Sequence, residues 1–401
     1  MRLSTAHTFD AGIDNLQRRQ LELAEQQMQM TSGKRVNRAS DDPTAAARAE
    51  RALALESRSV ASQRAVEASR NAMQTGESAL GDATELLQQA RETLVAAGNG
   101  SYSDSERTSL VQALRGIRNQ LFAVANRSDG SGGFVFGGQG SSAPPFVERP
   151  LPEGVAFVGT AGQTVVASGE ALPVTLDGEA AWLQARTGNG VFETQATTQN
   201  GSAWIDAGSV GNPAAVTGDP YSLSFSVDAA GVTTYTVLRD GLPTALANEP
   251  YQSGTAIEID GLSFKITGQP ADGDRFDAVP SEASLNIFKM LDRAAAALET
   301  PGLNGGQATQ AVTLGLRDID ASLGRLQSQR AQAGEALNRI DGVEDRLAAV
   351  KLGAKVERSS AEDLDMVEAI SKFQQQQSGY EAALKSYSMV QRLSLFQYIN
   401  P

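Results

Sequence analysis

Three carboxylates in the segment ADGDRFD have the residue type and the close spacing of a cation site. They are Asp272, Asp274 and Asp277. Carboxylate oxygens are preferred ligands of Ca²⁺, but the segment lacks the ligand series and the bidentate glutamate of an EF-hand loop. An Asp-Gly pair is also typical of a tight turn. We therefore expect a turn before a last strand here rather than a calcium site.

Histidine and cysteine, two residue types that often carry out catalysis, are nearly absent. His7 is the only histidine, and the chain contains no cysteine. Metal centres that need several His or Cys ligands are therefore excluded. The glycine-rich segment 130–140 is not followed by the lysine and Ser/Thr pair of a phosphate-binding loop. We predict no catalytic residue, no metal and no cofactor, and therefore no enzyme.

Two weaker patterns concern carbohydrates. Trp182 and Trp204 could line a sugar site, although an isolated tryptophan more commonly packs in a core. Asn126 and Asn200 each begin an Asn-X-Ser triplet, a glycosylation pattern short enough to occur by chance. A surface binding module stays open as one alternative function.

Composition favours a protein of several domains whose partners are not nucleic acids. A length of 401 residues exceeds one ordinary domain, so two or three are expected. The 34 basic and 47 acidic side chains give a net charge of −13, which argues against binding to a polyanionic backbone. Residues 134–280 hold 5 basic and 16 acidic side chains, so −11 of that charge lies in one region.

The sequence contains no segment that would hold it in a membrane. No run of about 20 apolar residues is present, so no membrane span is expected. The start, MRLSTAHTFDAGID, lacks the apolar core flanked by basic residues of a secretory signal. The lack of cysteine fits the cytoplasm, and it equally fits a protein exported unfolded through a narrow channel.

Composition also divides the chain into helical ends and a β-type middle. Residues 134–280 hold 11 of the 14 prolines and both tryptophans. We predict a mainly α protein, an elongated coiled-coil-like helical rod built from both halves of the chain, with an inserted antiparallel β domain. The expected parts are an N-terminal assembly helix and turn at 1–40, rod halves at 41–133 and 281–360, the β insertion at 134–280, and a C-terminal assembly helix at 361–401.

Sevenfold repeats of apolar residues predict where the rod helices meet. In the N-terminal half, large side chains alternate with small ones, which lets a partner helix approach closely. In the C-terminal half the repeat exceeds three heptads, with Arg330 and Glu344 as polar positions that either fix the register or lie at the edge. The predicted rod seam consists of Val66, Met73, Leu80, Leu87, Leu94, Leu316, Leu323, Leu337 and Leu347.

Capping signals predict where helices begin. Asp42 precedes a proline, as is typical of a cap followed by a first turn. Ser103 with Glu106, and Ser359 with Glu362, match the capping box. We therefore expect helices to begin after Asp42, Ser103 and Ser359.

Alternation of polar and apolar residues predicts hairpins in the middle region. Residues 221–227 alternate, and a second such run follows at 233–238 after a turn. Residues 257–259 and 262–266 flank an Asp-Gly pair, which is a strong turn signal. Several short strands at this spacing are typical of a sandwich or a small barrel.

Both ends of the chain carry an apolar stripe at helical spacing, and such a stripe needs a covering partner. Ordering about 30 residues costs about 1–2 kcal/mol each, and few large apolar side chains are available to offset it. We expect the ends to order when several subunits assemble; the alternative is that the two stripes dock on each other within one monomer. The predicted assembly interface comprises Phe9, Ile13, Leu16, Leu23, Met30, Met366, Ile370, Phe373, Tyr380, Leu384, Tyr387, Leu393 and Phe396.

Several segments resemble bacterial flagellins and their junction relatives. Residues 29–43, QMTSGKRVNRASDDP, look like the N-terminal signature of that superfamily. Residues 330–339 and 387–400 are similar to its C-terminal rod and terminal helix. FVFGGQG at 134–140 and GQPADGDRF at 268–276 resemble motifs of hook-associated proteins. The resemblance covers residues 1–146 and 268–401, and it covers 147–267 only as an insertion.

This resemblance implies a structural subunit of the bacterial flagellum, outside the cell, at the hook–filament junction. It implies a ring of copies of this chain between hook-associated protein 1 and the filament of flagellin. It also implies export through the flagellar type III channel without a cleaved signal, and an export chaperone that shields the C-terminal helix.

Two rival functions remain open. One is flagellin itself, although the motifs at 134–140 and 268–276 speak against it. The other is the surface binding module in the β insertion. Cellular abundance distinguishes the first rival from a junction protein, and glycan binding by the insertion tests the second.

Overall fold

The computed structural model describes residues 5–99, 102–150, 154–167 and 170–399, with the side chains of 5–8, 167 and 391–399 left out. The chain divides into two compact units. Unit 1 combines Met1–Arg64 with Glu344–Pro401, and unit 2 is Ala65–Val343. Two long helices, α2 (Pro43–Ala97) and α6 (Gly305–Glu362), contribute to both units.

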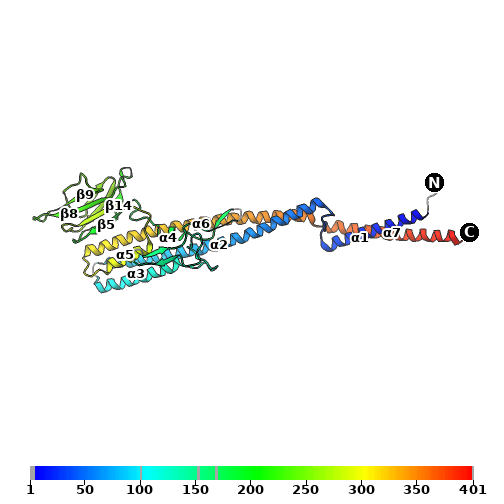
Figure 1. The fold of residues 1–401 in the computed structure, drawn as a ribbon, viewed down its shortest axis with the longest axis horizontal. Helices are drawn as coiled ribbons and strands as arrows, with labels where there is room; N and C mark the ends of the chain where they lie inside the picture. Colours follow the sequence, from blue (N-terminus) through cyan, green and yellow to red (C-terminus); the bar gives the residue numbers. More distant parts are fainter. Residues whose placement is uncertain (1–4, 100–101, 151–153, 168–169, 400–401) are drawn as a thin grey trace. The chain divides into compact units, whose positions relative to one another are not determined.

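Unit 1 consists mainly of helices. Helices α1 (Thr5–Ser32) and α7 (Met366–Ile399) lie side by side (Figure 1). They are antiparallel, because the start of α1 meets the far end of α7. The rings of Phe9 and Tyr387 are 6.2 Å apart and edge to face, and a Cβ on Gly379 would lie 2.9 Å from the Arg19 guanidinium.

Two of the predicted helix starts are confirmed. Helix α2 begins at Pro43, where Asp42 Oδ1 accepts the N–H of Ala45 at 2.9 Å. Helix α3 (Asp104–Ala125) begins with the complete capping box of Ser103 and Glu106. In both places a short polar side chain satisfies N–H groups that the first helical turn leaves without a partner.

The third predicted start, after Ser359, is wrong. Helix α6 continues through that position to Glu362, and α7 begins only at Met366. Asp365 is the true cap, because its Oδ1 accepts the N–H of Val367 at 2.9 Å. A capping-box pattern cannot be distinguished from an ordinary helical Ser-X-X-Glu when the flanking turns are equally good helix formers.

The helical part of unit 2 contains α2, α3, α5 (Ile287–Glu299) and α6. Helices α3 and α5 pack against each other (Figure 1), with the rings of Phe122 and Phe288 6.0 Å apart. Helices α2 and α6 approach closely at Gly315, where a Cβ would lie 2.8 Å from Leu94 Cδ1. This glycine on α6 lets the large Leu94 side chain of α2 lie against the α6 backbone.

A β sandwich forms the larger part of the insertion, and both of its sheets contribute to one apolar core. The first sheet has the order β10-β9-β8-β14-β5, with β11 also paired to β9. The second has the order β12-β13-β6, with β7 also on β13. The strands are β5 (Phe192–Thr198), β6 (Trp204–Ile205), β7 (Ser209–Val210), β8 (Tyr221–Val227), β9 (Thr233–Arg239), β10 (Leu242–Pro243), β11 (Glu249–Pro250), β12 (Ala256–Ile259), β13 (Leu262–Thr267) and β14 (Arg275–Pro280), with a 3-10 turn at Pro213–Ala215.

Both predicted hairpins are confirmed. Strands β8 and β9 pair antiparallel over their whole length, with Tyr221 opposite Arg239. Strands β12 and β13 pair across Asp260 and Gly261, which have φ values of 44° and 80°. Positive φ at both central residues is the geometry that an Asp-Gly turn favours.

The first part of the insertion packs on the helices and is separate from the sandwich. It contains β1 (Phe146–Glu148) paired with β2 (Val155–Phe157), β3 (Val165–Ala167) paired with β4 (Ala171–Pro173), and the short helix α4 (Gly178–Trp182). Trp182 has no exposed surface and stacks on Phe288 of α5 at 5.7 Å. Gly138 has a φ of 64°, and a Cβ there would lie 2.0 Å from Thr160 O, so the FVFGGQG motif forms a tight crossing.

Candidate assembly surface

The apolar stripes of α1 and α7 face each other and stay partly open to solvent. No described side chain of α1 is buried, and between Met366 and Val390 only Ala369 is. Ile13 remains 41% exposed and Leu384 remains 43% exposed. One partner helix covers only one side of a stripe, so this surface can accept further helices.

The predicted interface residues fall into three groups. The structure shows the docking within one monomer that was the alternative expectation, so the ends do have an internal partner, but the docking is incomplete. The partly buried residues are Phe9, Leu16, Leu23, Met30, Phe373, Tyr380 and Tyr387. The exposed ones are Ile13, Met366, Ile370 and Leu384. The side chains of Leu393 and Phe396 lie outside the described residues, and so does that of His7, which is not one of the predicted interface residues.

A groove of about 290 Å³ runs between α1 and α7. Phe9 and Leu16 line it from one helix, and Tyr387 and Val390 line it from the other. At Gly12 a Cβ would meet the Tyr387 ring at 3.2 Å, so glycine allows the ring to lie against the α1 backbone. Asn15, Arg19 and Ser386 also line the groove, and the rest of its lining is apolar, which suits a helix side chain.

On α2, the large side chains of the predicted seam are buried. Val66, Met73, Leu80, Leu87 and Leu94 are each at most 2% exposed. The small residues that alternate with them are buried too: Ser69, Gly76, Ala83, Ala90 and Ala97.

On α6, most of the buried residues belong to the predicted repeat, but they are not the leucines named for the seam. Leu316, Leu323 and Leu337 are partly exposed, and so is Leu347 at the end of the repeat. The buried positions, seven residues apart, are Val312, Ile319, Leu326, Ala333 and Ile340. Leucines occupy two positions of this heptad, and the pattern alone does not decide which of them faces the partner.

Ion pairs flank the seam in unit 2. They join α2 to α6 and are Arg70 with Asp341 at 2.8 Å, Glu77 with Arg330 Nε at 3.1 Å, and Arg91 with Asp320 at 3.0 Å. Their α2 positions are multiples of seven apart and alternate in sign. A shift by one heptad would place Arg70 opposite Arg330, or Glu77 opposite Asp341, so these charges favour one register.

The sandwich is attached to α6 through side-chain amides that bond to main-chain atoms. Gln310, which is 4% exposed, accepts the N–H of Ile205 at 2.7 Å and donates to its carbonyl oxygen at 3.3 Å. Asn304 and Gln307 each donate to a carbonyl oxygen in the 199–201 loop at 3.0 Å. We call Asn304, Gln307 and Gln310 the amide strip. The sequence analysis did not single out these residues. Their spacing of three residues could have indicated the contact, since it places them near one face of a helix.

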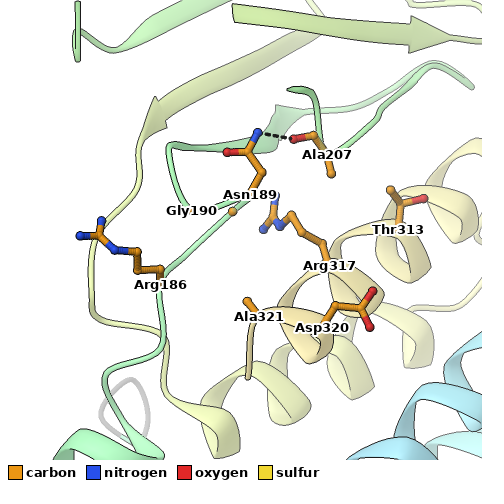
Figure 2. Close-up of a pocket in the computed structure, with 9 residues that line it drawn as sticks. Arg186, Asn189, Gly190, Ala207, Thr313, Arg317, Asp320 and Ala321 are labelled. Atoms are coloured by element: carbon orange, nitrogen blue, oxygen red, sulfur yellow. Dashed lines mark hydrogen bonds between the residues drawn. The ribbon is translucent and has the colours of Figure 1, made fainter. Parts of the chain in front are cut away.

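A buried arginine completes the attachment of the sandwich. Figure 2 shows Arg317 extending from α6 toward the 188–190 turn. Its Nη1 donates to the Thr194 carbonyl at 2.6 Å, and its Nη2 pairs with Glu193 at 2.9 Å and with Asp318 at 2.8 Å. A buried guanidinium needs partners of this kind. The hollow of about 480 Å³ beside it has no histidine among its lining residues, and its one carboxylate, Asp320, is paired with Arg91.

The ADGDRFD segment forms the expected turn. Gly273 has a φ of 80°, and β14 follows directly. Asp274 has no exposed surface, and it accepts main-chain N–H groups from Asn200 at 2.7 Å and from Ala271 at 2.8 Å. Within the described ranges, no group of His, Asp or Glu side chains is arranged to hold a metal ion.

The two carbohydrate patterns lie in different surroundings. Trp182 belongs to the helical core, and Trp204 in β6 is partly exposed. The Asn126 amide forms two hydrogen bonds of 3.0 Å with the main chain of Phe146, so its nitrogen already has a structural role. In the part of the chain that the structure describes, none of the helices combines the length and the hydropathy needed to cross a bilayer.

Comparison with known proteins finds similarity to flagellin-like proteins. Residues 8–141 match the bacterial flagellin N-terminal helical region. Over 99% of its length the chain is 26% identical to flagellar hook-associated protein 3 of Salmonella typhimurium and 25% identical to that of Escherichia coli, covering 99% of each.

Solved structures agree with this similarity. The crystal structure of hook-associated protein 3 from Legionella pneumophila is 27% identical, with a TM-score of 0.67 over 74% of this chain and 93% of that one. A crystal structure of Xanthomonas campestris FlgL is 26% identical, with a TM-score of 0.68 over 78% and 99%.

The long helices, the antiparallel β insertion and the match to a flagellin N-terminal region make the chain similar to flagellin-like proteins of the bacterial flagellum. Among these, it is similar along its whole length to flagellar hook-associated protein 3. The resemblance inferred from its motifs is thus confirmed.

Proposed function

We propose that this chain is a non-enzymatic junction subunit, copies of which form a ring between hook-associated protein 1 and the flagellin filament. Residues 1–40 and 361–401 supply the contacts between subunits. The observation that carries this proposal is the half-open stripe on α1 and α7, where Leu384 and Ile370 are each 43% exposed within the helix pair. Such a stripe gains further burial only from other chains.

Assembly completes the ordering of these two helices. A pair of helices that buries only part of each stripe has little free energy to offset the entropy of ordering about 60 residues. Further helices packed on the open sides add about 1.5–3 kcal/mol for each large side chain that becomes buried. The helices are therefore marginal in the free subunit and rigid in the assembled one.

The exposed side chains of α7 also suit an export chaperone. Val367 is 81% exposed and Met389 is 60% exposed, and such side chains promote aggregation before assembly. A chaperone that covers α7 competes directly with the subunit contacts. It must therefore leave before the ring forms.

Substitution of Leu384 by Asp tests the assembly surface. A charge on this exposed position leaves units 1 and 2 folded but cannot be buried against a neighbouring subunit. We expect Leu384→Asp to be exported and to fail to connect filaments, so filament protein is shed into the medium. The matched control is Gln375→Asp, which adds the same charge two and a half turns away on the opposite face.

Two outcomes would contradict the proposal. Normal filament attachment in the Leu384→Asp strain would remove the support for this interface. Equal defects in the Leu384→Asp and Gln375→Asp strains would show that any added charge on α7 disrupts the protein. The defect of Leu384→Asp would then not come from the loss of this particular surface.

A further inference from the structure

The two connections that lead to the terminal helices lie against each other in unit 1. Residues 33–42 link α1 to α2, and residues 363–365 link α6 to α7. Gly33 has a φ of 69°, in the left-handed region that favours glycine, and turns the chain sharply where α1 ends. Each connection by itself would allow the two helices that it links to rotate relative to each other.

Main-chain hydrogen bonds join the two connections. The N–H of Arg35 donates to the Glu362 carbonyl at 2.7 Å, and the N–H of Leu364 donates to the Gly33 carbonyl at 3.0 Å. These two bonds enclose Lys34 and Asp363, which form an isolated antiparallel bridge. This is the pattern of a short antiparallel ladder, which fixes the distance and the direction of both segments.

Side chains reinforce the contact between the two connections. Arg35 Nη2 donates to the Ala361 carbonyl at 2.8 Å, and Lys34 Nζ pairs with Glu362 at 3.1 Å. Arg35 also pairs with Asp42, the cap of α2, at 3.2 Å. One arginine therefore connects the end of α6 with the beginning of α2.

We propose that residues 33–42 and 363–365 form one paired joint, so that α1 and α7 change direction only together. Neither connection can swing while the ladder between Gly33, Arg35, Glu362 and Leu364 is intact. Opening the joint requires both main-chain bonds to break, and then both helices are released. This inference rests on unit 1 alone and does not depend on the junction role.

A disulfide trap tests whether the two connections stay together. The bridge between Lys34 and Asp363 is of the non-hydrogen-bonded kind, with Cα atoms about 4.5 Å apart, which a disulfide can span. The chain has no cysteine of its own. We expect Lys34→Cys/Asp363→Cys to cross-link under mild oxidation about tenfold faster than Ala39→Cys/Asp363→Cys, whose loop cysteine lies five residues from the bridge. Equal cross-linking rates for the two double variants would contradict the proposed joint.

Distance measurements test the coupling itself. Spin labels at Lys355→Cys on α6 and Glu381→Cys on α7 measure a distance that depends on the direction of α7 relative to α6. We expect Lys34→Ala/Arg35→Ala, which changes residues of the α1–α2 connection alone, to broaden this distance distribution, because it removes the side-chain bonds to Ala361 and Glu362 that reinforce the ladder. The control Arg38→Ala/Arg51→Ala removes the same charge. Arg51 Nε donates to the Ala47 carbonyl within its own helix and takes no part in the joint.

A third variant separates the joint from the packing of α1 on α7. Phe9→Ser removes the edge-to-face contact with Tyr387 far from the joint. We expect it to leave the α6–α7 distribution near that of the unmodified chain. The proposal fails if Lys34→Ala/Arg35→Ala leaves the distribution unchanged, or if Phe9→Ser broadens it equally.

Discussion

Gln310 and Asn126 act through the same device, an amide side chain that pairs with the main chain of a single strand residue. Gln310 bonds to both polar groups of Ile205, and Asn126 bonds to both polar groups of Phe146. The partner side chain is irrelevant to such a contact, so the strands can vary in sequence without losing it. Neither contact is visible in the strand sequences.

Gln310→Leu should destabilise the attachment of the sandwich. The substitution leaves the N–H and the carbonyl of Ile205 buried without these partners, which costs about 1–3 kcal/mol. Urea unfolding measures the loss, and Gln327→Leu at an exposed position of the same helix is the matched control. Similar effects of both substitutions would contradict a specific role for the amide.

Asp42 makes the stability of the connection between α1 and α2 depend on pH. A main-chain hydrogen bond from Ala45, then bonds from Thr44 and Arg35, lower the pKa of Asp42 from 3.8 to about 2. A carboxyl whose folded pKa is depressed stabilises the fold above its ordinary pKa, and that stability is lost as pH falls through the folded pKa.

We therefore expect wild type to melt at a higher temperature than Asp42→Asn above about pH 4, and the difference to disappear near pH 2. Circular dichroism at a series of pH values measures both melting curves. A difference that stays constant over this range would show that the charge of Asp42 is not the cause.

At the scale of elements, the seam of α6 makes a prediction that separates two neighbouring leucines. Leu326 has no exposed surface, whereas Leu323, three residues earlier, is partly exposed. Leu326→Ala should cost about 2–5 kcal/mol of unfolding free energy, because it opens a cavity in the packed seam. Leu323→Ala should cost clearly less. The reverse order would favour the seam that the leucine repeat alone predicts.

Local signals predicted elements well where one residue type satisfies one geometric need. Asp260 with Gly261 fixed a hairpin, and Asp42 fixed a helix start. Prediction failed where two solutions were locally equivalent. Ser359 could cap a helix or lie within one, and in the structure α6 continues through it to Glu362.

At the scale of the whole molecule, the insertion proved to have two parts. The composition of residues 134–280 indicated one β domain, but the aromatic residues of its first part, such as Trp182 and Phe146, pack on Phe288 of α5. Composition records which residues prefer strands and turns. It does not record which core an aromatic side chain joins, because that choice depends on distant residues.

The terminal helices show the same limit. Their stripes were evident in the sequence, and so was the need for a partner, yet the choice between docking within one monomer and docking between subunits was not. The structure contains the first, with Phe9 against Tyr387. The exposed Ile13, Ile370 and Leu384 are what the proposed assembly would cover.

Hydrogen exchange of the free subunit and of assembled junctions is the most direct test of this account. We expect the amides of α1 and α7 to exchange much faster than those of the α2 seam in the free subunit, and to become protected in the junction. Strong protection of residues 5–32 and 366–399 in an isolated subunit, equal to that of Leu80 and Leu87, would contradict it.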